Sequence, residues 1–345
     1  MRIALDAMGG DLAPAAAVAG AIQFLRRRGS DSVTLVGDAK RIEDELARRK
    51  AAGSFCVHDA PEALGRDVKP SRAARPNRRS SIHACFDLVC RGEADAVVSA
   101  GNSGALMAAA LHLLGRLEGV ERPAIVTPLP TLRGGCALLL DSGANVTCRP
   151  AHLVQFAHLG AAWARRVMGL ARPKVAVLAN GEEPTKGTDL TRAASGLLRA
   201  SSLEFVGYVE GKDLFTGEVD VIVTDGFTGN VVLKTTEGAA AALGAMLKRE
   251  IEARSTARLG NLLMAPAFAG FKKIVDWAEY GGAPLVGVDG VCIVAHGRST
   301  ARAFKNALAT ASQACSTAFS DDLARAALAA RELIGSTAAR QAAKR

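Results

Sequence analysis

The sequence repeats one unit along its length: a short aliphatic run, a polar turn that contains glycine, and often an Ala-rich helical stretch. Strands that alternate with helices are typical of a parallel sheet covered on both faces. Continuous apolar runs such as residues 137–140 fit strands that are buried on both sides. We therefore predict an α/β protein with strands at residues 3–7, 33–36, 96–99, 137–140, 175–178, 221–223 and 291–294.

The polar turns after these strands predict where a ligand binds. Open α/β sheets bind ligands beyond the carboxyl ends of their strands, and each of these turns would lie at that edge. The turn Gly-Asn-Ser-Gly at residues 101–104 leads into a helix, so it either holds an anion on free backbone N–H groups or only caps the helix. The chain has no GxGxxG or GxxxxGK[ST] motif, so nothing supports a standard dinucleotide or P-loop site.

Composition narrows the class of protein. Of 345 residues, 49% are apolar, which is enough for a large core and argues against disorder. No apolar run reaches the ~18 residues of a spanning helix. An acid at position 6 interrupts any signal-peptide layout, so we expect a cytoplasmic protein. The seven cysteines have no CxxC spacing and the histidines do not cluster, which predicts buried thiols and no metal site.

The net charge of +9 suits an acidic partner or an anionic membrane surface. Aromatic residues make up only 4% of the chain, and we find no nucleic-acid motif. We therefore expect no nucleic acid among the partners.

Six motifs together resemble the phosphate acyltransferase (PlsX) family, and they occur in the family's order. They are Asp-Ala-Met-Gly-Gly-Asp at 6–11, Val-Ser-Ala-Gly-Asn-Ser-Gly-Ala-Leu-Met at 98–107, Leu-Leu-Asp-Ser-Gly-Ala-Asn at 139–145, Thr-Asp-Gly-Phe-Thr-Gly-Asn-Val-Val-Leu-Lys at 224–234, Glu-Tyr-Gly-Gly-Ala-Pro-Leu at 279–285 and Ala-His-Gly at 295–297. Two positions depart from the family pattern. Asn180 lies one place later than the family's usual Asn, and Ser103 replaces a Thr while keeping the hydroxyl.

The resemblance implies an enzyme that converts acyl-ACP (acyl carrier protein) and inorganic phosphate into acyl phosphate and free ACP, at the start of phospholipid synthesis. It implies a three-layer α/β/α sandwich, similar to phosphotransacetylases and to isocitrate/isopropylmalate dehydrogenases. It also implies a homodimer without metal or organic cofactor, attached peripherally to the membrane, where a glycerol-3-phosphate acyltransferase uses the product. We expect one catalytic unit with a central cleft over residues 1–320, including a protruding amphipathic helical segment at 255–280, and an Ala/Arg-rich helix or tail at 321–345.

The same resemblance points to the catalytic residues. Lys186 is the first candidate, because an ammonium suits phosphate or the developing oxyanion; the alternative is a surface lysine paired with Glu182 or Glu183. Asn230 could donate to the oxyanion or cap a helix. His296 could protonate the leaving thiolate or bond to backbone at a strand end. Phosphate or acyl phosphate is assigned to Asn102, Ser103 and Gly104.

Acids end three predicted strands, where they would orient Lys186, hold loop N–H groups or simply cap turns. These positions are Asp6, Asp141 and Asp225, with Gly226 and Asn145 beside them. A covalent acyl-thiol route is not expected, because free cysteine is mostly a small buried apolar residue and no base is assigned to any thiol. The thiols considered are Cys136, Cys148 and Cys292.

Two surfaces suggest partners. A basic stretch broken by Pro70 and Pro76 is either an ACP-docking loop or a solvated loop; it contains Arg66, Lys69, Arg72, Arg75, Arg78 and Arg79. The aromatic-rich stretch from residue 259 to residue 277 suits a membrane surface or, alternatively, a dimer or core contact. We expect Pro266 and Gly270 to break that stretch into two short pieces.

Three other functions remain open. A phosphotransacetylase-like enzyme would perform the same chemistry on acyl-CoA. A dehydrogenase of the related fold lacks a nucleotide fingerprint here. A non-catalytic scaffold would use only the basic and membrane-binding surfaces.

Overall fold

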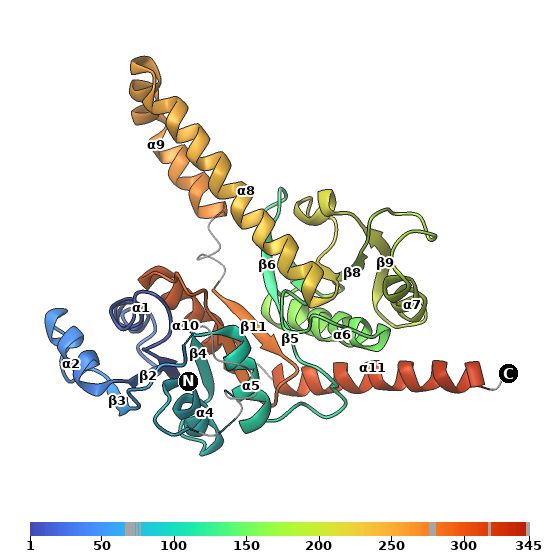
Figure 1. Cartoon of the computed structure of the whole chain (residues 1–345), viewed down its shortest axis with the longest axis horizontal. Helices are drawn as coiled ribbons and strands as arrows, with labels where there is room; N and C mark the ends of the chain where they lie inside the picture. Colours follow the sequence, from blue (N-terminus) through green and yellow to red (C-terminus); the bar gives the residue numbers. More distant parts are fainter. Residues whose placement is uncertain (66–72, 74, 76, 276–280, 317–318, 343–345) are drawn as a thin grey trace.

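The computed structural model describes residues 1–65, 73, 75, 77–275, 281–316 and 319–342. It contains two β-sheets side by side, with helices packed against them, and a helical hairpin that protrudes from the body (Figure 1). Most strand pairs are parallel, as the repeating strand–turn–helix unit predicts. The predicted α/β class is confirmed.

The first sheet, within the described residues, has seven strands in the order β3-β2-β1-β4-β12-β11-β5. The pairs from β3 to β12 are parallel, whereas β11 is antiparallel to both β12 and β5. The strands are β1 (Arg2–Asp6), β2 (Ser32–Gly37), β3 (Cys56–Asp59), β4 (Ala96–Ser99), β5 (Ala124–Ile125), β11 (Ala283–Val286) and β12 (Val291–Val294).

Helices cover both faces of this sheet because successive strand residues point to opposite sides. Ile3 and Leu5 belong to the cluster that holds helix residues Phe24 and Phe304, whereas Ala4 packs in a separate cluster on the other face. The helices are α1 (Ala15–Leu25), α2 (Ala39–Arg48), α4 (Ser81–Cys90), α5 (Ser103–Leu113) and α10 (Ala301–Ser316).

The second sheet has the order β6-β7-β10-β8-β9, and only its edge strand β6 is antiparallel to its neighbour. Helices α6 and α7 pack against it, and the short helix η1 lies next to β6 and β7. The elements are β6 (Thr127–Pro130), β7 (Cys136–Leu140), α6 (Pro150–Val167), β8 (Lys174–Leu178), α7 (Asp189–Leu198), β9 (Glu204–Val209), η1 (Gly211–Phe215) and β10 (Val221–Val223).

The two sheets share one apolar core. Leu5 of the first sheet belongs to the same buried cluster as Leu140 and Val223 of the second. The chain crosses between the sheets at Val126, the single residue between β5 and β6. The assignment of residues 1–320 to one catalytic unit with a central cleft remains a prediction.

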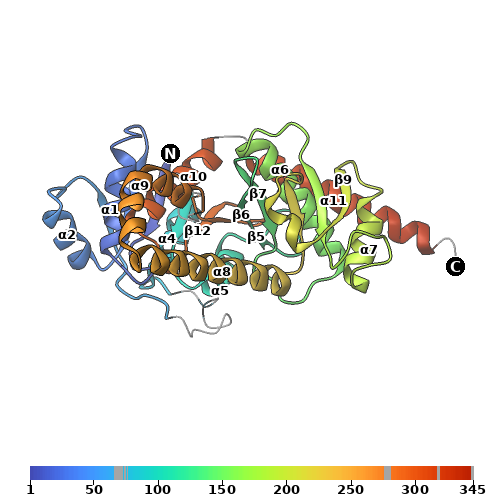
Figure 2. The ribbon, with the colours of Figure 1, turned by 90° about the horizontal axis from the view of Figure 1, so that it is seen from above.

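The protruding hairpin consists of α8 (Gly226–Glu252) and α9 (Ser255–Val275), which run side by side (Figures 1 and 2). The predicted break in this segment is wrong, because α9 is continuous with Pro266 inside it. A proline removes one backbone hydrogen bond. We attribute the tolerance of that loss to lateral packing on α8.

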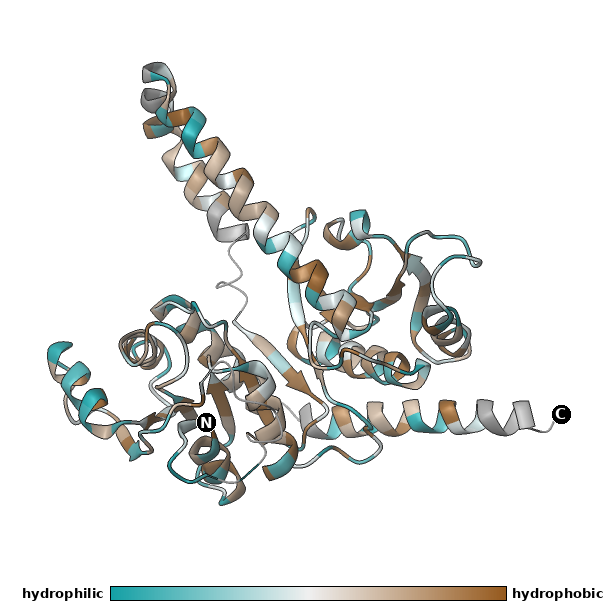
Figure 3. Cartoon of the chain, in the orientation of Figure 1, coloured by the Kyte–Doolittle hydropathy of each residue, from teal (hydrophilic) through white to brown (hydrophobic). Residues whose placement is uncertain are grey.

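After β12 and α10 the chain ends in α11 (Phe319–Ala342), which lies along α6 of the second sheet (Figure 1). Among the described residues, no helix is long and apolar enough to cross a membrane. Figure 3 shows hydrophobic and hydrophilic residues mixed along the hairpin, and several of its large apolar side chains are exposed. These are Leu243, Met246, Leu247, Leu262, Leu263, Met264 and Phe271.

Candidate active site

Three loops meet at the carboxyl edge of the first sheet, after β1, β4 and β12. The N–H of Asp11 donates to the carbonyl of Gly297 at 2.7 Å, which joins the first loop to the third. A Cβ atom built on Gly9 would lie 2.7 Å from the backbone nitrogen of Gly101, so the first and second loops touch. Glycine is needed at this position because any side chain would push the loops apart.

Asp6, the last residue of β1, holds the loops at this edge in place through hydrogen bonds. Its carboxylate is buried and accepts from the backbone N–H of Met8 at 3.0 Å and from the Ser99 hydroxyl at 2.6 Å. Ser99 in turn accepts from the N–H of Gly101 at 3.0 Å. Burial raises the pKa of Asp6, and the hydrogen bond from Ser99 opposes that rise. Asp6 therefore positions two loops, one of the roles that the sequence suggested.

A cavity of about 470 Å³ opens above these loops. The helices α4 and α5 both begin at its wall, so the positive ends of two helix dipoles border one space. Such an arrangement favours an anion. The lining residues are Asp6, Met8, Gly9, Gly10, Asp11, Ala63, Leu64, Gly65, Ser81, Ile82, Ala100, Gly101, Asn102, Ser103 and Gly297.

Asn102 is the N-cap of α5, where its side chain accepts from the N–H of Ala105 at 2.9 Å. Ser103 is the first residue of α5, is exposed and lines the cavity, whereas Gly104, the second residue, is not part of the lining. The alternatives of cap and anion site are thus compatible, since Asn102 caps the helix and also lines the cavity.

Ser81 is a cavity residue that sequence reasoning missed. It opens α4 and is 1% exposed, and its hydroxyl interacts with the Asp6 carboxylate, where it opposes the rise in the pKa of Asp6. Ser81 therefore belongs to the polar network around Asp6 at the wall of the cavity. The pair of serines before the apolar run of α4 is a helix-start signal, but only tertiary packing brings that helix start to the cavity.

A second group of loops forms at the carboxyl edge of the second sheet, after β7 and β10. The buried Asp141 accepts from the N–H groups of Ile125 and Ala144, both at 3.0 Å, and from that of Asn145 at 2.6 Å. Asn145 ties the same loop back through its amide to the carbonyl of Pro123 at 2.7 Å. Burial raises the pKa of Asp141, while these donors oppose the rise. Asp141 and Asn145 thus hold backbone in place.

Asn230 lies one turn inside α8 rather than at its start. Asp225 is the N-cap and accepts from the N–H of Thr228 at 2.9 Å, so the capping alternative for Asn230 is excluded. Asn230 is exposed, and a Cβ atom built on Gly143 would lie 3.6 Å from its Cβ. Gly226 packs so closely on the loop that a Cβ there would lie 2.7 Å from the Asn145 carbonyl oxygen.

Lys186 lies in the loop after β8, at the same edge, and its side chain is exposed. Glu182 pairs with Lys212 at 3.6 Å, and no ion pair of Lys186 is found among the described residues. The N–H of Gly187 donates to the displaced Asn180 at 2.8 Å, so Asn180 shapes this loop. The structure does not bring Lys186 into the cavity of the first sheet.

His296 follows β12 and is half-buried. Its Nδ1 accepts from the backbone N–H of Arg298 at 3.1 Å. The proton of the neutral ring is therefore assigned to Nε2. A cysteine nucleophile has little support, because burial raises the pKa of Cys148 to about 11 and that of Cys292 to about 12.

The basic stretch is described only in part, since Arg66, Lys69 and Arg72 lie outside the described residues. Arg75 and Arg78 are exposed, and Arg79 pairs with Glu62 at 2.8 Å. Trp277, Glu279 and Tyr280 of the other predicted segments also lie outside the described residues. Within those residues, no group of three or more metal-ligating side chains occurs.

The fold is that of the phosphotransacetylases. A phosphotransacetylase from Streptococcus pyogenes superimposes with a TM-score of 0.62 over 92% of this chain and 94% of its own, at 17% identity. A branched-chain phosphotransacylase from Enterococcus faecalis gives a TM-score of 0.56 over 91% of this chain and 99% of its own, at 14% identity. The predicted likeness to this fold is confirmed.

Sequence comparison defines the family within that fold. A family model described as fatty acid synthesis protein matches residues 1–322. A phosphate acyltransferase from Anaeromyxobacter sp. (strain Fw109-5) is 54% identical over 99% of this chain and 94% of its own. One from Myxococcus xanthus is 57% identical over 90% of this chain and 89% of its own. The chain belongs to the phosphate acyltransferase family and is an acyltransferase, as its motifs indicated.

Proposed function

We propose that this enzyme transfers a fatty acyl group from acyl-ACP to inorganic phosphate, for phospholipid synthesis. The observation that carries the proposal is the cavity where α4 and α5 both begin, which suits a phosphate dianion. Membership of the phosphate acyltransferase family supports the reaction class. Phosphate would bind against the loop N–H groups and the hydroxyl of Ser103.

The reaction needs no enzyme nucleophile. A phosphate oxygen attacks the thioester carbonyl, the carbon–sulfur bond breaks, and the thiolate leaves and takes up a proton. The protein supplies approximation of the two substrates, charge neutralisation and stabilisation of the oxyanion. Lys186 would neutralise phosphate or oxyanion charge, Asn230 would donate to the oxyanion, and the Nε2–H of His296 would hydrogen-bond to the departing thiolate, which takes its proton from water.

The loops of the two sheets are physically linked, which supports a site shared between them. Ala144, in the loop held by Asp141, packs against the apolar cluster that contains Leu106 of α5. The next residue back, Gly143, borders Asn230. A substrate in the first-sheet cavity would thus lie on the same side of the molecule as the loop that supports Asn230.

We further propose that Arg75, Arg78 and Arg79 dock ACP, a strongly acidic protein. Docking of an acidic protein needs cationic side chains whose charge is not already neutralised by ion pairs within the enzyme. Arg78 fits this condition, because its side chain is 87% exposed and its one carboxylate contact within the described residues, with Asp87, is long at 3.9 Å. We also propose that the enzyme is cytoplasmic and that the hairpin holds it peripherally at the membrane. It would act there as a homodimer, beside the membrane glycerol-3-phosphate acyltransferase.

The fold is also compatible with one alternative function, the transfer of an acyl group from acyl-CoA, as in phosphotransacetylase-like enzymes. The deciding assay follows thiol release from palmitoyl-ACP and from palmitoyl-CoA, each with and without phosphate. Phosphate-dependent release from ACP supports the proposal. Release from CoA alone would favour the alternative function, and no release from either would favour a non-catalytic scaffold.

A further inference from the structure

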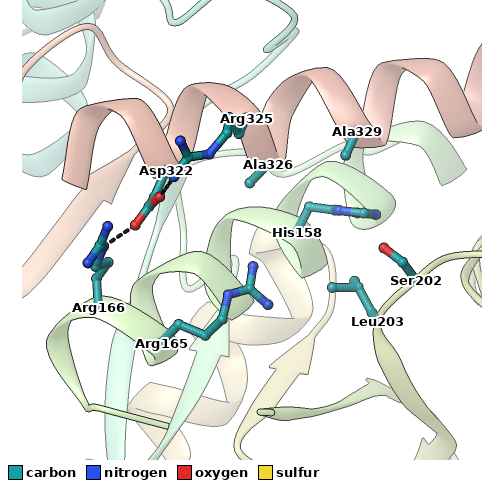
Figure 4. Close-up of a pocket in the computed structure, with 9 residues that line it drawn as sticks. All are labelled: His158, Arg165, Arg166, Ser202, Leu203, Asp322, Arg325, Ala326 and Ala329. Carbon is teal, nitrogen blue, oxygen red and sulfur yellow. Dashed lines mark hydrogen bonds and ion pairs between the residues drawn. The ribbon is translucent and has the colours of Figure 1, made fainter. Parts of the chain in front are cut away.

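A second cavity of about 470 Å³ lies away from the strand edges, between α6, α11 and the turn that precedes β9. Figure 4 shows its wall: α6 and α11 contribute facing side chains, and the turn closes one end. Nothing in the proposed reaction uses this space. The lining residues are His158, Arg165, Arg166, Ser202, Leu203, Asp322, Arg325, Ala326 and Ala329.

The cavity carries surplus positive charge. Arg166 and Arg325 both pair with Asp322, so one carboxylate serves two guanidinium groups. Arg165 has no ion pair within the described residues, and partial burial lowers its pKa. With three cations and one anion on the wall, the cavity favours an anionic ligand.

His158 adds a buried ring nitrogen for which the described residues offer no partner. It is 4% exposed, and its Nε2 has no hydrogen-bond partner within the described residues. Its side chain reaches from α6 toward Ser202 (Figure 4). Buried polar atoms are normally hydrogen-bonded, so this nitrogen favours a ligand that can pair with it.

We propose that this cavity is a second, non-catalytic site that binds a small phosphate monoester. The Arg165 fork, the Ser202 hydroxyl and His158 Nε2 would hold the phosphate oxygens. Leu203, Ala326 and Ala329 form an apolar wall against which the carbon part of the ester would lie. Because the wall combines α6 and α11, the bound ester would fasten the C-terminal helix to the second sheet.

The first test is calorimetric titration of the full-length protein with phenyl phosphate. The Arg165→Gln variant should bind at least about tenfold more weakly, because a charge-assisted bond is lost. The Arg331→Gln variant, on α11 but outside the cavity, should bind like the wild type. Undiminished binding by Arg165→Gln, or no binding by the wild type, would overturn the proposal.

The second test locates the ligand by NMR, independently of activity. The chain has six histidines, so the ring C–H resonance of His158 can be assigned by its loss in His158→Gln. Phenyl phosphate should shift that resonance and raise the pH at which it titrates, because the anion stabilises the protonated ring. The protein's own charged groups around the ring do not change when ligand is added, so a shift would come from the ligand. These groups are Arg165, Arg166, Asp322 and Arg325. An unmoved resonance would overturn the assignment.

A third variant keeps the test decisive if Arg165→Gln does not fold. Ser202 is exposed, so Ser202→Asp places a negative charge at the cavity without disturbing the core, and it should abolish binding. Retained binding in this variant would count against the site. Inorganic phosphate should bind more weakly than phenyl phosphate; equal affinity would overturn the assignment to an ester, since the apolar wall would contribute nothing.

Discussion

At the residue scale, the cations of the second-sheet edge divide into paired and unpaired ones. Lys212 lies between Glu210 at 3.5 Å and Glu182 at 3.6 Å, and these carboxylates raise its pKa. Lys186 has no such pair among the described residues and is exposed. An unpaired ammonium is available to a substrate anion, whereas a paired one has its charge balanced by its neighbours.

Lys186→Ala should therefore lower kcat/KM for acyl transfer by roughly 10²- to 10³-fold, the cost of removing one electrostatic stabiliser from a transition state. The fold should persist because the side chain is exposed. Phosphate-dependent release of ACP thiol measures the effect. Lys212→Ala is the matched control and should retain activity; equal losses in both variants would remove Lys186 from its catalytic role.

His158 should make stability depend on pH. Burial and the nearby Arg165 lower its pKa from 6.5 to about 4. The unfolded chain binds the proton near pH 6.5 and the folded chain only near pH 4, so stability falls as pH drops through that interval. In urea unfolding, the His158→Gln variant should lose less stability between pH 7 and pH 4.5 than the wild type. Parallel losses would contradict the burial argument.

At the scale of elements, the start of α8 is fixed by close backbone contact. A Cβ atom on Gly229 would lie only 1.9 Å from the carbonyl oxygen of Asp141. Real Cβ atoms do not approach so closely, so the helix or the loop has to move. Since Asn230 is the next residue, such a shift would misplace it as well.

Gly229→Ala should destabilise the protein by about 1–3 kcal/mol and reduce activity together with stability. Gly238→Ala, in the same helix but in open space, should instead stabilise by about 0.5–1 kcal/mol, because alanine favours helix. Chemical unfolding of both variants measures the difference. A tolerated Gly229→Ala would mean that the contact relaxes freely.

The hairpin has two competing explanations, a membrane surface and a dimer contact. Leu262 is 72% and Leu263 80% exposed, values that are unfavourable for a surface facing only water. The double variant Leu262→Glu and Leu263→Glu should abolish sedimentation with anionic vesicles while soluble turnover persists. Leu328→Glu, on α11, is the control. If vesicle binding survives and light scattering shows dissociation instead, the dimer contact is the better explanation.

The sequence predicted the strands and the polar turns well, because β-branched runs and glycine turns are local signals. It could not predict Ser81 as a site residue, since α4 reaches the cavity only through tertiary packing. The sequence also could not predict that Asp225, rather than Asn230, is the N-cap of α8, because a predicted helix start is uncertain by a few residues. Local sequence rules predict a break at Pro266, but they do not include the packing of α9 on α8, to which we attribute its continuity.

At the scale of the whole molecule, the net charge of +9 favours encounter with an acidic carrier. Reversing Arg78 and Arg79 to Glu should raise KM for acyl-ACP and weaken its dependence on salt, with little change in kcat. The pairs with Asp87 and Glu62 would become repulsive, so the melting temperature has to be checked as well.

Arg172→Glu is the control for this prediction, because Arg172 is 84% exposed and lies at the second sheet. It should change the overall charge without changing KM. If both sets of variants shift KM equally, steering is a property of net charge and not of a docking surface. If neither does, the basic stretch takes no part in recognition.

The central position of β12 has a consequence for how the protein folds during its synthesis. This strand lies between β4 and β11 in the first sheet, yet it comes from residues 291–294, whereas every strand of the second sheet is made by residue 223. Chains usually fold from the N-terminal end as they emerge from the ribosome. Here the second sheet can form first, while the edge of β4 that pairs with β12 keeps its backbone N–H and C=O groups unpaired for nearly 200 further residues. A nascent chain stalled shortly after β10 should therefore protect the later-made sheet from protease before the earlier one.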